Sequence, residues 1–297
     1  MQFIRDIYAA KQASGQPVIS FEFFPPRTPE GDRHLLEKHI PALAQARPDF
    51  CSVTYGAGGS TRDKTLMIVE RIQREHHLTA LAHLTCVNHT REEVQAMLDK
   101  IRALGCKNIL ALRGDPPGGS EFQKTAGGFE FSSELVGFVR GQDCFSIGVA
   151  GFPEGHVANK IGKHDDWRHL KEKVEAGADF VLTQLFFDNA DFFEFHDYAV
   201  NTLGIRAPLV PGIVPILSAG QITKFTQLCG AKIPPPLRKK LDELGDDDEA
   251  ATEFGIEYAT QQCEGLLRAG VPGLHFYTLN KSYSTVQVLK NLGLIGG

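Results

Sequence analysis

The feature of this sequence that most limits its fold is a regular alternation of short β-rich runs with amphipathic helical patterns. Successive runs are mostly about 30 residues apart, which is the length of one strand–helix step. Strict alternation predicts a parallel sheet, and eight runs favour closure into a (β/α)8 TIM barrel. The predicted strands are Val18–Phe23, Phe50–Tyr55, Ala80–Leu84, Asn108–Leu112, Ser146–Ala150, Phe180–Thr183, Leu209–Ile213 and Gly273–Tyr277.

Helical patterns with recognisable ends lie between the predicted strands. Thr90 and Glu93 predict a capping box at the start of the pattern over Arg91–Leu104. The acidic run Asp246–Glu249 predicts another helix start, because carboxylates are stabilised at the positive end of the helix dipole. The gap before the last strand is about twice the usual step. It predicts extra helices before strand eight, over Pro236–Leu244 and Asp247–Ala269.

Composition narrows the class of protein. A chain of 297 residues with 42% hydrophobic residues can form one large core, so we expect a single barrel domain over residues 1–297. A formal net charge of −5 without a basic cluster argues against a nucleic-acid partner. No apolar run of about 18 residues predicts a membrane span, and the charged N-terminus lacks a signal-peptide pattern. Six scattered cysteines predict free thiols, mostly buried, and a cytoplasmic location.

Polar residues follow the predicted strands, at the end where TIM barrels carry their active sites. Glu22 lies among aromatic residues in the sequence, so we expect a raised pKa and a role as general acid. The alternative is an interior carboxylate paired with a cation. Asp115 follows Gly114, whose missing side chain would let the backbone approach a ligand. The alternative for Asp115 is a turn-initiating residue before proline.

Three histidines at strand ends, His83, His156 and His275, raise the question of a metal site. No H-x-H pair or matching carboxylate accompanies them. We therefore expect no metal, and histidines that are internally satisfied or contact a cofactor.

Seven motifs together resemble the methylenetetrahydrofolate reductase family. They run in order across nearly the whole chain, and five fall at predicted strand ends. The motifs are SFEFFPPRTPEG (20–31), SVTYGAGGSTRDKT (52–65), HLTC (83–86), LALRGDPP (110–117), LTQLFFD (182–188), VPGIVPI (210–216) and HFYTLN (275–280).

The resemblance implies a flavoprotein oxidoreductase. FAD would take hydride from NADH or NADPH, and the enzyme would then reduce 5,10-methylenetetrahydrofolate to 5-methyltetrahydrofolate in a ping-pong reaction. The product would serve methionine synthesis and one-carbon metabolism. The chain looks like the bacterial form, without room for a C-terminal regulatory domain, and we expect a homo-oligomer. The alternative is a folate-binding barrel that transfers methyl groups to a corrinoid without redox chemistry.

The resemblance also implies roles for individual residues. Glu22 would be the acid that protonates the folate, and Asp115 would lie between flavin and pterin. The expected substrate-binding residues are Gln184, Gln221, Phe225 and Lys281. The expected FAD-binding residues are Thr54, Tyr55, His83, Arg113, Gly114, Asp115, Phe131, Ala150, Phe152, His156, Asp166, His169 and Lys173.

Four positions depart from the family pattern. Phe131 and Phe152 stand where tyrosine is common, so stacking on the cofactor is retained while a hydroxyl is lost. His169 stands where asparagine is expected. Lys281 replaces an arginine, and it could pair with the glutamate tail of folate but not through a bidentate fork.

Overall fold

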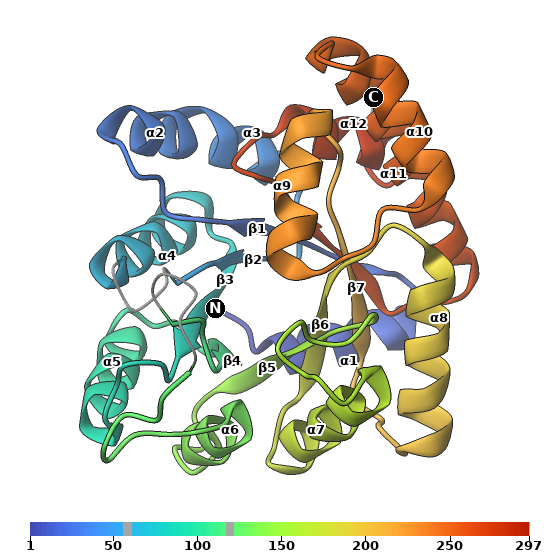
Figure 1. Cartoon of the computed structure of the whole chain (residues 1–297). Coiled ribbons are helices and arrows are strands. Elements are labelled where there is room, and N and C mark those ends of the chain that lie inside the picture. The colour runs from blue at the N-terminus through green and yellow to red at the C-terminus, as the bar shows by residue number, and fades with distance from the viewer. Residues whose placement is uncertain (56–60, 117–121, 297) are drawn as a thin grey trace.

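The strands of the computed structural model close into a parallel barrel in sequence order (Figure 1). The model describes residues 1–55, 61–116 and 122–296, so parts of the motifs at 52–65 and 110–117 lie outside the described residues. All the predicted strands are confirmed, although the second ends at Val53. They are β1 (Val18–Phe23), β2 (Phe50–Val53), β3 (Thr79–Thr85), β4 (Asn108–Leu112), β5 (Ser146–Gly151), β6 (Phe180–Leu185), β7 (Leu209–Ile213) and β8 (Gly273–Tyr277).

Helices surround this sheet in the usual outer layer (Figure 1). They are α2 (Pro29–His34), α3 (Ile40–Ala44), α4 (Arg62–His76), α5 (Arg91–Ala103), α6 (Ser132–Arg140), α7 (Lys163–Glu175), α8 (Asn189–Asp197), α9 (Ala219–Cys229), α10 (Pro235–Leu244), α11 (Asp248–Arg268) and α12 (Tyr283–Asn291). Two π-helical turns, Leu35–His39 and Tyr198–Thr202, continue α2 and α8.

The predicted helix starts and the inserted helices are confirmed. Thr90 Oγ1 accepts from Glu93 N at 3.3 Å, and Glu93 accepts from Thr90 N at 2.9 Å. Asp247 caps α11 through Ala250 N at 3.0 Å. The insertion before β8 holds α10 and α11 as predicted, but it also holds α9, which was not predicted. These helices enclose a separate apolar cluster beyond the ends of β6 and β7.

Strand alternation divides the side chains between the two faces of the barrel wall. Phe21 and Phe23 belong to the core between the sheet and the helices. The inner face carries an apolar layer that includes Val18, Phe50 and Phe180. Ser20 and Glu22 follow Val18 on this inner face, so polar groups lie above the apolar layer, nearer the carboxy-terminal rim.

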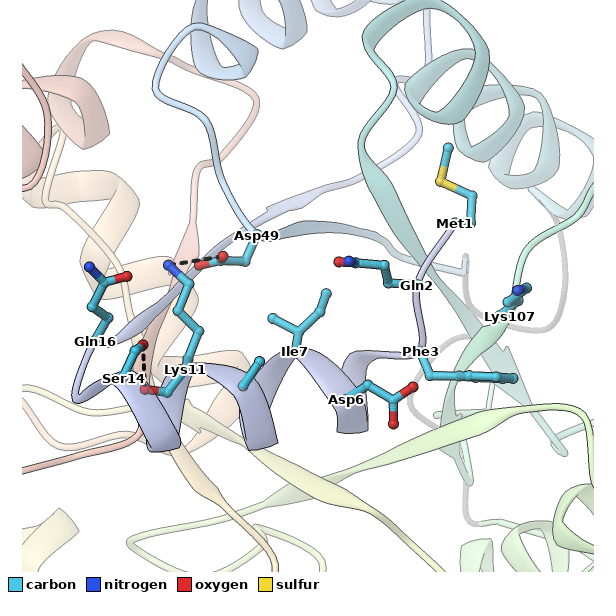
Figure 2. A pocket seen from close by; sticks show the side chains of 11 residues that line it. Met1, Gln2, Phe3, Asp6, Ile7, Lys11, Ser14, Gln16, Asp49 and Lys107 are labelled. Atoms are coloured by element: carbon cyan, nitrogen blue, oxygen red, sulfur yellow. Dashed lines mark hydrogen bonds and ion pairs between the residues drawn. The ribbon is translucent and has the colours of Figure 1, made fainter.

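Helix α1 (Ile4–Ser14), which was not predicted, closes the opposite end of the barrel. Its Ile4, Ile7 and Tyr8 are buried against the inner apolar layer. A hollow of about 540 Å³ lies outside this helix, beside Asp49 and Lys107, which immediately precede β2 and β4 (Figure 2). This hollow is therefore at the amino-terminal ends of the strands, away from the predicted site.

The structure bears on the state of the cysteines and on membrane-spanning helices. All six cysteines are free thiols, and Cys51, Cys86, Cys106 and Cys263 are buried, as predicted. None of the helices in the described ranges combines the length and apolarity needed to cross a bilayer.

Asn108→Ala should destabilise the protein by at least about 2 kcal/mol, because it leaves buried backbone groups unsatisfied. Asn108 is fully buried; it accepts from Ile4 N at 2.8 Å and donates to Gln2 O and Ala80 O. Chemical denaturation measures the loss. Asn201→Ala, on an exposed helix face, should change the free energy of unfolding by no more than about 0.5 kcal/mol. Asn108 holds the start of α1 through Ile4 N and Gln2 O, and equal effects of the two substitutions would contradict this role.

Candidate functional site

Side chains from four strands meet just below the carboxy-terminal rim of the barrel. Glu22 of β1 lies at their centre, with its side chain 14% exposed. Ser52 of β2 donates to Glu22 Oε2 at 3.1 Å, and His275 Nε2 of β8 lies 3.3 Å from the same oxygen. His83 Nε2 of β3 is also 3.3 Å from Oε2, but outside hydrogen-bonding geometry. The fold thus joins the predicted acid and a predicted cofactor residue in one polar cluster.

The prediction of a raised Glu22 pKa was wrong. Burial does push the pKa of this carboxyl upward, but His83 and His275 favour its charged form and bring the pKa well below its usual range. The error arose because sequence neighbours on a strand point to opposite faces. Phe21 and Phe23 face the outer helices, so they do not surround the carboxyl. Glu22 is an interior carboxylate with polar partners, as in the alternative prediction of a carboxylate paired with a cation, and its two imidazole neighbours are cations only when they are protonated.

His275 is completely buried and has a polar contact at each ring nitrogen. Its Nδ1 lies 2.8 Å from Ser20 Oγ, while Nε2 faces Glu22. Ser20 Oγ can also donate to Leu274 O at 3.4 Å. Stacking on Phe50, with 6.2 Å between ring centroids, holds the imidazole plane.

Ser20 and Ser52 were not predicted as site residues. The available signal was the alternation of β1, in which Ser20 and Glu22 share one face, together with the pairing of Ser20 with His275 in the β1–β8 register.

A second group of predicted residues gathers between β5 and α7. Lys173 Nζ donates to Ala150 O at 2.7 Å and lies 5.8 Å from the centre of the Phe152 ring. The Phe152 ring packs edge-on against His156, with 4.6 Å between their ring centroids. Asp166, in the first turn of α7, interacts electrostatically with both Lys173 and His156. The structure therefore brings together five of the predicted FAD-binding residues.

Burial dominates the ionisation of this second group. It lowers the pKa of Lys173 to about 8, against the opposing effect of Asp166. It also lowers the pKa of His156 and raises the pKa of Asp166, although Lys173 and His156 act against the latter shift. Each group is therefore poorly solvated, and a polar ligand would improve its environment.

The residues after β4 lie next to this second group. Arg113 and Asp115 both influence His156 electrostatically, and Arg113 lies 4.9 Å from the centre of the Phe122 ring. Asp115 is exposed and makes no hydrogen bond with the described residues.

Gly114 has a packing role beyond the one expected from the sequence. Its φ is +83°, and a Cβ would lie 2.7 Å from Val87 and 2.9 Å from Thr85. The position therefore requires glycine for close contact with the chain after β3, whether or not a ligand approaches.

Other predicted FAD-binding residues lie at the edges of these two groups. Thr54 follows β2, where its carbonyl accepts from Thr65 Oγ1 at 2.8 Å. Tyr55 is buried, its hydroxyl has no hydrogen-bond partner among the described residues, and burial raises its pKa to about 12. Phe131 is 52% exposed before α6. The His169 side chain is 52% exposed on α7 and lies within ion-pair distance of Asp165 and Glu172, so the structure places it on the solvent side of the second group.

A register irregularity sets the position of Gln184. The β6–β7 pairing shifts between Leu182 and Leu185. There Tyr277 donates from its hydroxyl to Thr183 O at 2.6 Å, and Gly212 N donates to Thr183 Oγ1 at 2.9 Å. A Cβ at Gly212 would lie 2.3 Å from Thr183 O, so only glycine fits this bulge. Bulges of this kind re-aim side chains near active sites.

The predicted substrate residues surround the mouth without contacting one another. Gln184 lines a narrow hollow together with Phe152, and its Oε1 accepts from Leu185 N at 2.9 Å. Gln221 and Phe225 lie on α9, and Lys281 is exposed between β8 and α12. Among the described residues, no hydrogen bond or ring contact joins these four. Within the part of the chain that the structure describes, Gln221 Oε1 is buried without a partner.

The polar groups at the strand ends could hold a cofactor that has many hydrogen-bond donors and acceptors. Within the described residues, no group of three or more His, Cys, Asp and Glu side chains has an arrangement that could hold a metal ion. Buried polar atoms without partners, such as Tyr55 Oη and Thr85 Oγ1, lie near the strand ends. Buried polar atoms usually have a partner, and a cofactor with many donors and acceptors would supply one.

Comparison with known proteins identifies relatives along almost the whole chain. The family model for methylenetetrahydrofolate reductase matches residues 7–293. Methylenetetrahydrofolate reductase (NADH) 1 of Arabidopsis thaliana is 42% identical over 292 residues, which are 95% of this chain and 49% of the relative. The chain thus spans about half the length of the plant relatives. The 5,10-methylenetetrahydrofolate reductase of Escherichia coli is 36% identical over 96% of this chain and 94% of its own length.

A solved structure supports the fold. A protein from Clostridium thermocellum, described as binding two copies of 5-methyl-5,6,7,8-tetrahydrofolic acid, has a TM-score of 0.64 and 17% sequence identity. The alignment covers 97% of each chain. At this identity the likeness concerns the barrel alone.

Lys173→Met should remove a pH-dependent part of the stability. Because the folded pKa of Lys173 is about 8, below the 10.5 of a free lysine, the unfolded state binds more protons between these values. The free energy of unfolding of the wild type should therefore rise relative to that of the variant as pH increases from about 8 to about 10.5. Denaturation at several pH values measures this difference. Lys239→Met, whose parent side chain is 82% exposed, is the control. A pH-independent difference for Lys173→Met would refute the lowered pKa.

Proposed function

Because this chain belongs to the methylenetetrahydrofolate reductase family, we propose that it reduces 5,10-methylenetetrahydrofolate to 5-methyltetrahydrofolate, with FAD as cofactor and NADH or NADPH as electron source. The observation that carries the proposal is the polar cluster around Glu22. It lies inside the mouth of a barrel that the family model matches from residue 7 to residue 293.

The group between β5 and α7 supports FAD as the cofactor. Lys173 would face the pyrophosphate, and Asp166 would accept from a ribose hydroxyl. Phe152 and Phe131 would offer apolar rings, while Thr54, Tyr55, His83, Arg113, Gly114, His156 and His169 would complete the site. Held by these residues, the cofactor would supply hydride-transfer chemistry between the nicotinamide and the folate.

Glu22 would supply the proton that the folate nitrogen needs for ring opening. Its side chain is partly exposed at the mouth, while its partners lie deeper in the barrel. A carboxyl in this position could pass a proton to a bound substrate. Ser52 holds the carboxyl group in place and remains its partner after the proton has left.

The remaining residues would orient the folate and stabilise charge. Asp115 is exposed beside Arg113 and His156, and its carboxylate would favour the cationic iminium that follows ring opening. Gln184, aimed by the β6 bulge, would hydrogen-bond the pterin. Gln221, with its unpartnered Oε1, and Phe225 would contact the substrate from α9. Lys281 would pair with the glutamate tail.

Several expectations from the sequence stay predictions. NADH is the first nicotinamide to test, because plant relatives include it in their names. A single catalytic domain over 1–297, a homo-oligomer, a cytoplasmic location and a role in methionine synthesis are part of the proposal.

Anaerobic half-reactions test the function directly. The purified protein should carry a flavin absorbing near 450 nm, and chromatography after heat release should identify it as FAD. NADH or NADPH should bleach this absorbance, and methylenetetrahydrofolate should restore it while 5-methyltetrahydrofolate forms. A protein without flavin, or one whose absorbance does not return with folate, would exclude the proposed reaction. The first result would also favour methyl transfer without redox chemistry.

Glu22→Gln should separate the two half-reactions. The amide keeps the shape of the side chain but has no transferable proton, so the folate half-reaction should slow by at least ~10²-fold. Bleaching of the flavin by the nicotinamide should change little. Stopped-flow absorbance measures both rates. Glu253→Gln, on the exposed face of α11, makes the same chemical change outside the site and is the control. Equal losses in both half-reactions would show that Glu22 shapes the site instead.

A further inference from the structure

Phe24 lies at the mouth of the barrel, two residues after Glu22. Its side chain is 40% exposed, whereas Phe21 and Phe23 are completely buried against the outer helices. Among the described residues, no other aromatic ring or cation packs against it. We propose that Phe24, held in place by the side chain of Asn280, is the surface on which the aminobenzoyl ring of the folate stacks. This inference rests on the proposed function and names the part of the substrate that Phe24 recognises.

The backbone of β1 stays extended as far as Phe24. Glu22 O accepts from the chain after β8, and Phe23 O accepts from the chain after β2. Phe24 turns to the β8 side again, where its N and O both bond the side chain of Asn280. Main-chain groups that alternate in this way are those of a strand, and side chains alternate with them. Phe24 therefore lies on the inner face together with Glu22.

Asn280 takes the place of a neighbouring strand for Phe24. Its Oδ1 accepts from Phe24 N at 3.1 Å, and its Nδ2 donates to Phe24 O at 2.7 Å. Pro25 then ends the ladder because it has no N–H, and it favours an extended conformation at the residue before it. An exposed apolar residue needs no explanation by itself. This one, however, is fixed by its main chain on the face that carries the acid.

The proposed reaction brings the aminobenzoyl ring close to that acid. When the five-membered ring opens, the breaking carbon–nitrogen bond leaves its electron pair on the nitrogen that carries the aminobenzoyl group. This nitrogen takes the proton, and the cation remains on the pterin. A proton delivered from Glu22 therefore requires the aminobenzoyl ring to lie beside it. Phe24 is two residues, about 7 Å, further along the strand towards the mouth.

Lys281 extends the same order of groups. It follows Asn280 directly, and its main-chain N donates to Thr278 O at 2.9 Å, so it belongs to the loop that holds Phe24. Its side chain is exposed. An acid on the inner face, an aromatic ring at the rim and a cation in the adjoining loop match the nitrogen, the aminobenzoyl ring and the glutamate of the substrate. Offset or edge-on packing of two aromatic rings is favourable beyond the area that it buries.

Three ligands of decreasing length test this assignment. They are 5-methyltetrahydrofolate, 5-methyltetrahydropteroate, which has no glutamate, and 5,6-dimethyltetrahydropterin, which has no aminobenzoyl group. Anaerobic calorimetry on the FAD-loaded, reduced enzyme gives each Kd. Phe24→Leu keeps an apolar side chain without a ring, so the Kd of the first two ligands should rise by roughly three- to tenfold. The Kd of the pterin should be unchanged.

Two further variants serve as controls for Phe24→Leu. Phe24→Tyr keeps the ring and should bind all three ligands as the wild type does. Phe193→Leu makes the same chemical change on α8, at a side chain that is 39% exposed, and should alter no Kd.

The kinetics of Phe24→Leu should separate binding from chemistry. The stacked ring interacts alike before and during ring opening, so its loss should raise the KM for methylenetetrahydrofolate and leave the saturating rate of the folate half-reaction unchanged. Glu22→Gln should lower that saturating rate instead. The nicotinamide half-reaction should be the same in Phe24→Leu and wild type.

Asn280→Gly tests how the ring is held. Asn280 has a φ of +55°, which glycine adopts without strain, so the variant loses only the side chain. The Kd of the folate and of the pteroate should rise, and that of the pterin should not. With Phe24→Leu in the same chain, the Kd should be little higher than for Phe24→Leu alone, because Asn280 acts through Phe24.

The outcomes separate this proposal from the proposed function. Equal weakening of all three ligands in Phe24→Leu would mean that Phe24 shapes the whole mouth, and no weakening would mean that no ring stacks on it. A slower nicotinamide half-reaction with unchanged folate binding would assign the ring to the nicotinamide. Each of these results overturns the proposal. A wild type that binds none of the ligands, or whose reduced flavin methylenetetrahydrofolate does not reoxidise, would refute the proposed function instead.

Discussion

The burial of one carboxylate inside a closed barrel is the constraint on which this site depends. Removing a charge from water is costly unless hydrogen bonds and opposite charges replace the solvent. Ser52, His83 and His275 supply those interactions to Glu22, and His275 in turn requires Ser20. The polar groups of the inner face therefore form a connected layer, and replacing one of them changes the ionisation of the rest.

Closure of the barrel makes this layer possible by placing β1 beside β8. The loop after β8 then holds the end of β1. Thr278 Oγ1 donates to Glu22 O at 2.7 Å, and the Asn280 side chain bonds both Phe24 N, at 3.1 Å, and Phe24 O, at 2.7 Å. Leu279 and Asn280 both have positive φ, an uncommon conformation for residues other than glycine. The loop thus keeps an uncommon backbone conformation where it fixes the main chain of Glu22 and of Phe24, two residues further on.

The strands, and the helices with clear periodicity and caps, could be predicted because their signals are local. Apolar runs, helical periodicity, and caps such as Thr90 with Glu93 depend only on residues that are close together in the sequence. Helix α1 was missed although it carries local signals, since Ile4, Ile7 and Tyr8 have helical spacing and Gly15 ends it in the left-handed conformation. Its start has no such signal, because the N-cap position, Phe3, makes no side-chain cap. Helix α9 is capped by Ser218, but the patterns of α10 and α11 already account for much of the long segment before β8, so α9 was not predicted.

The arrangement of the site could be predicted less well than its residue types, because pairing between distant strands decides it. The sequence places Glu22 among phenylalanines, whereas the sheet places it among histidines that follow it by 61 and 253 residues. His169 and Lys173 share one helix, yet only Lys173 turns inward, to Ala150. A carboxyl predicted as an acid because of apolar neighbours is instead held by bases.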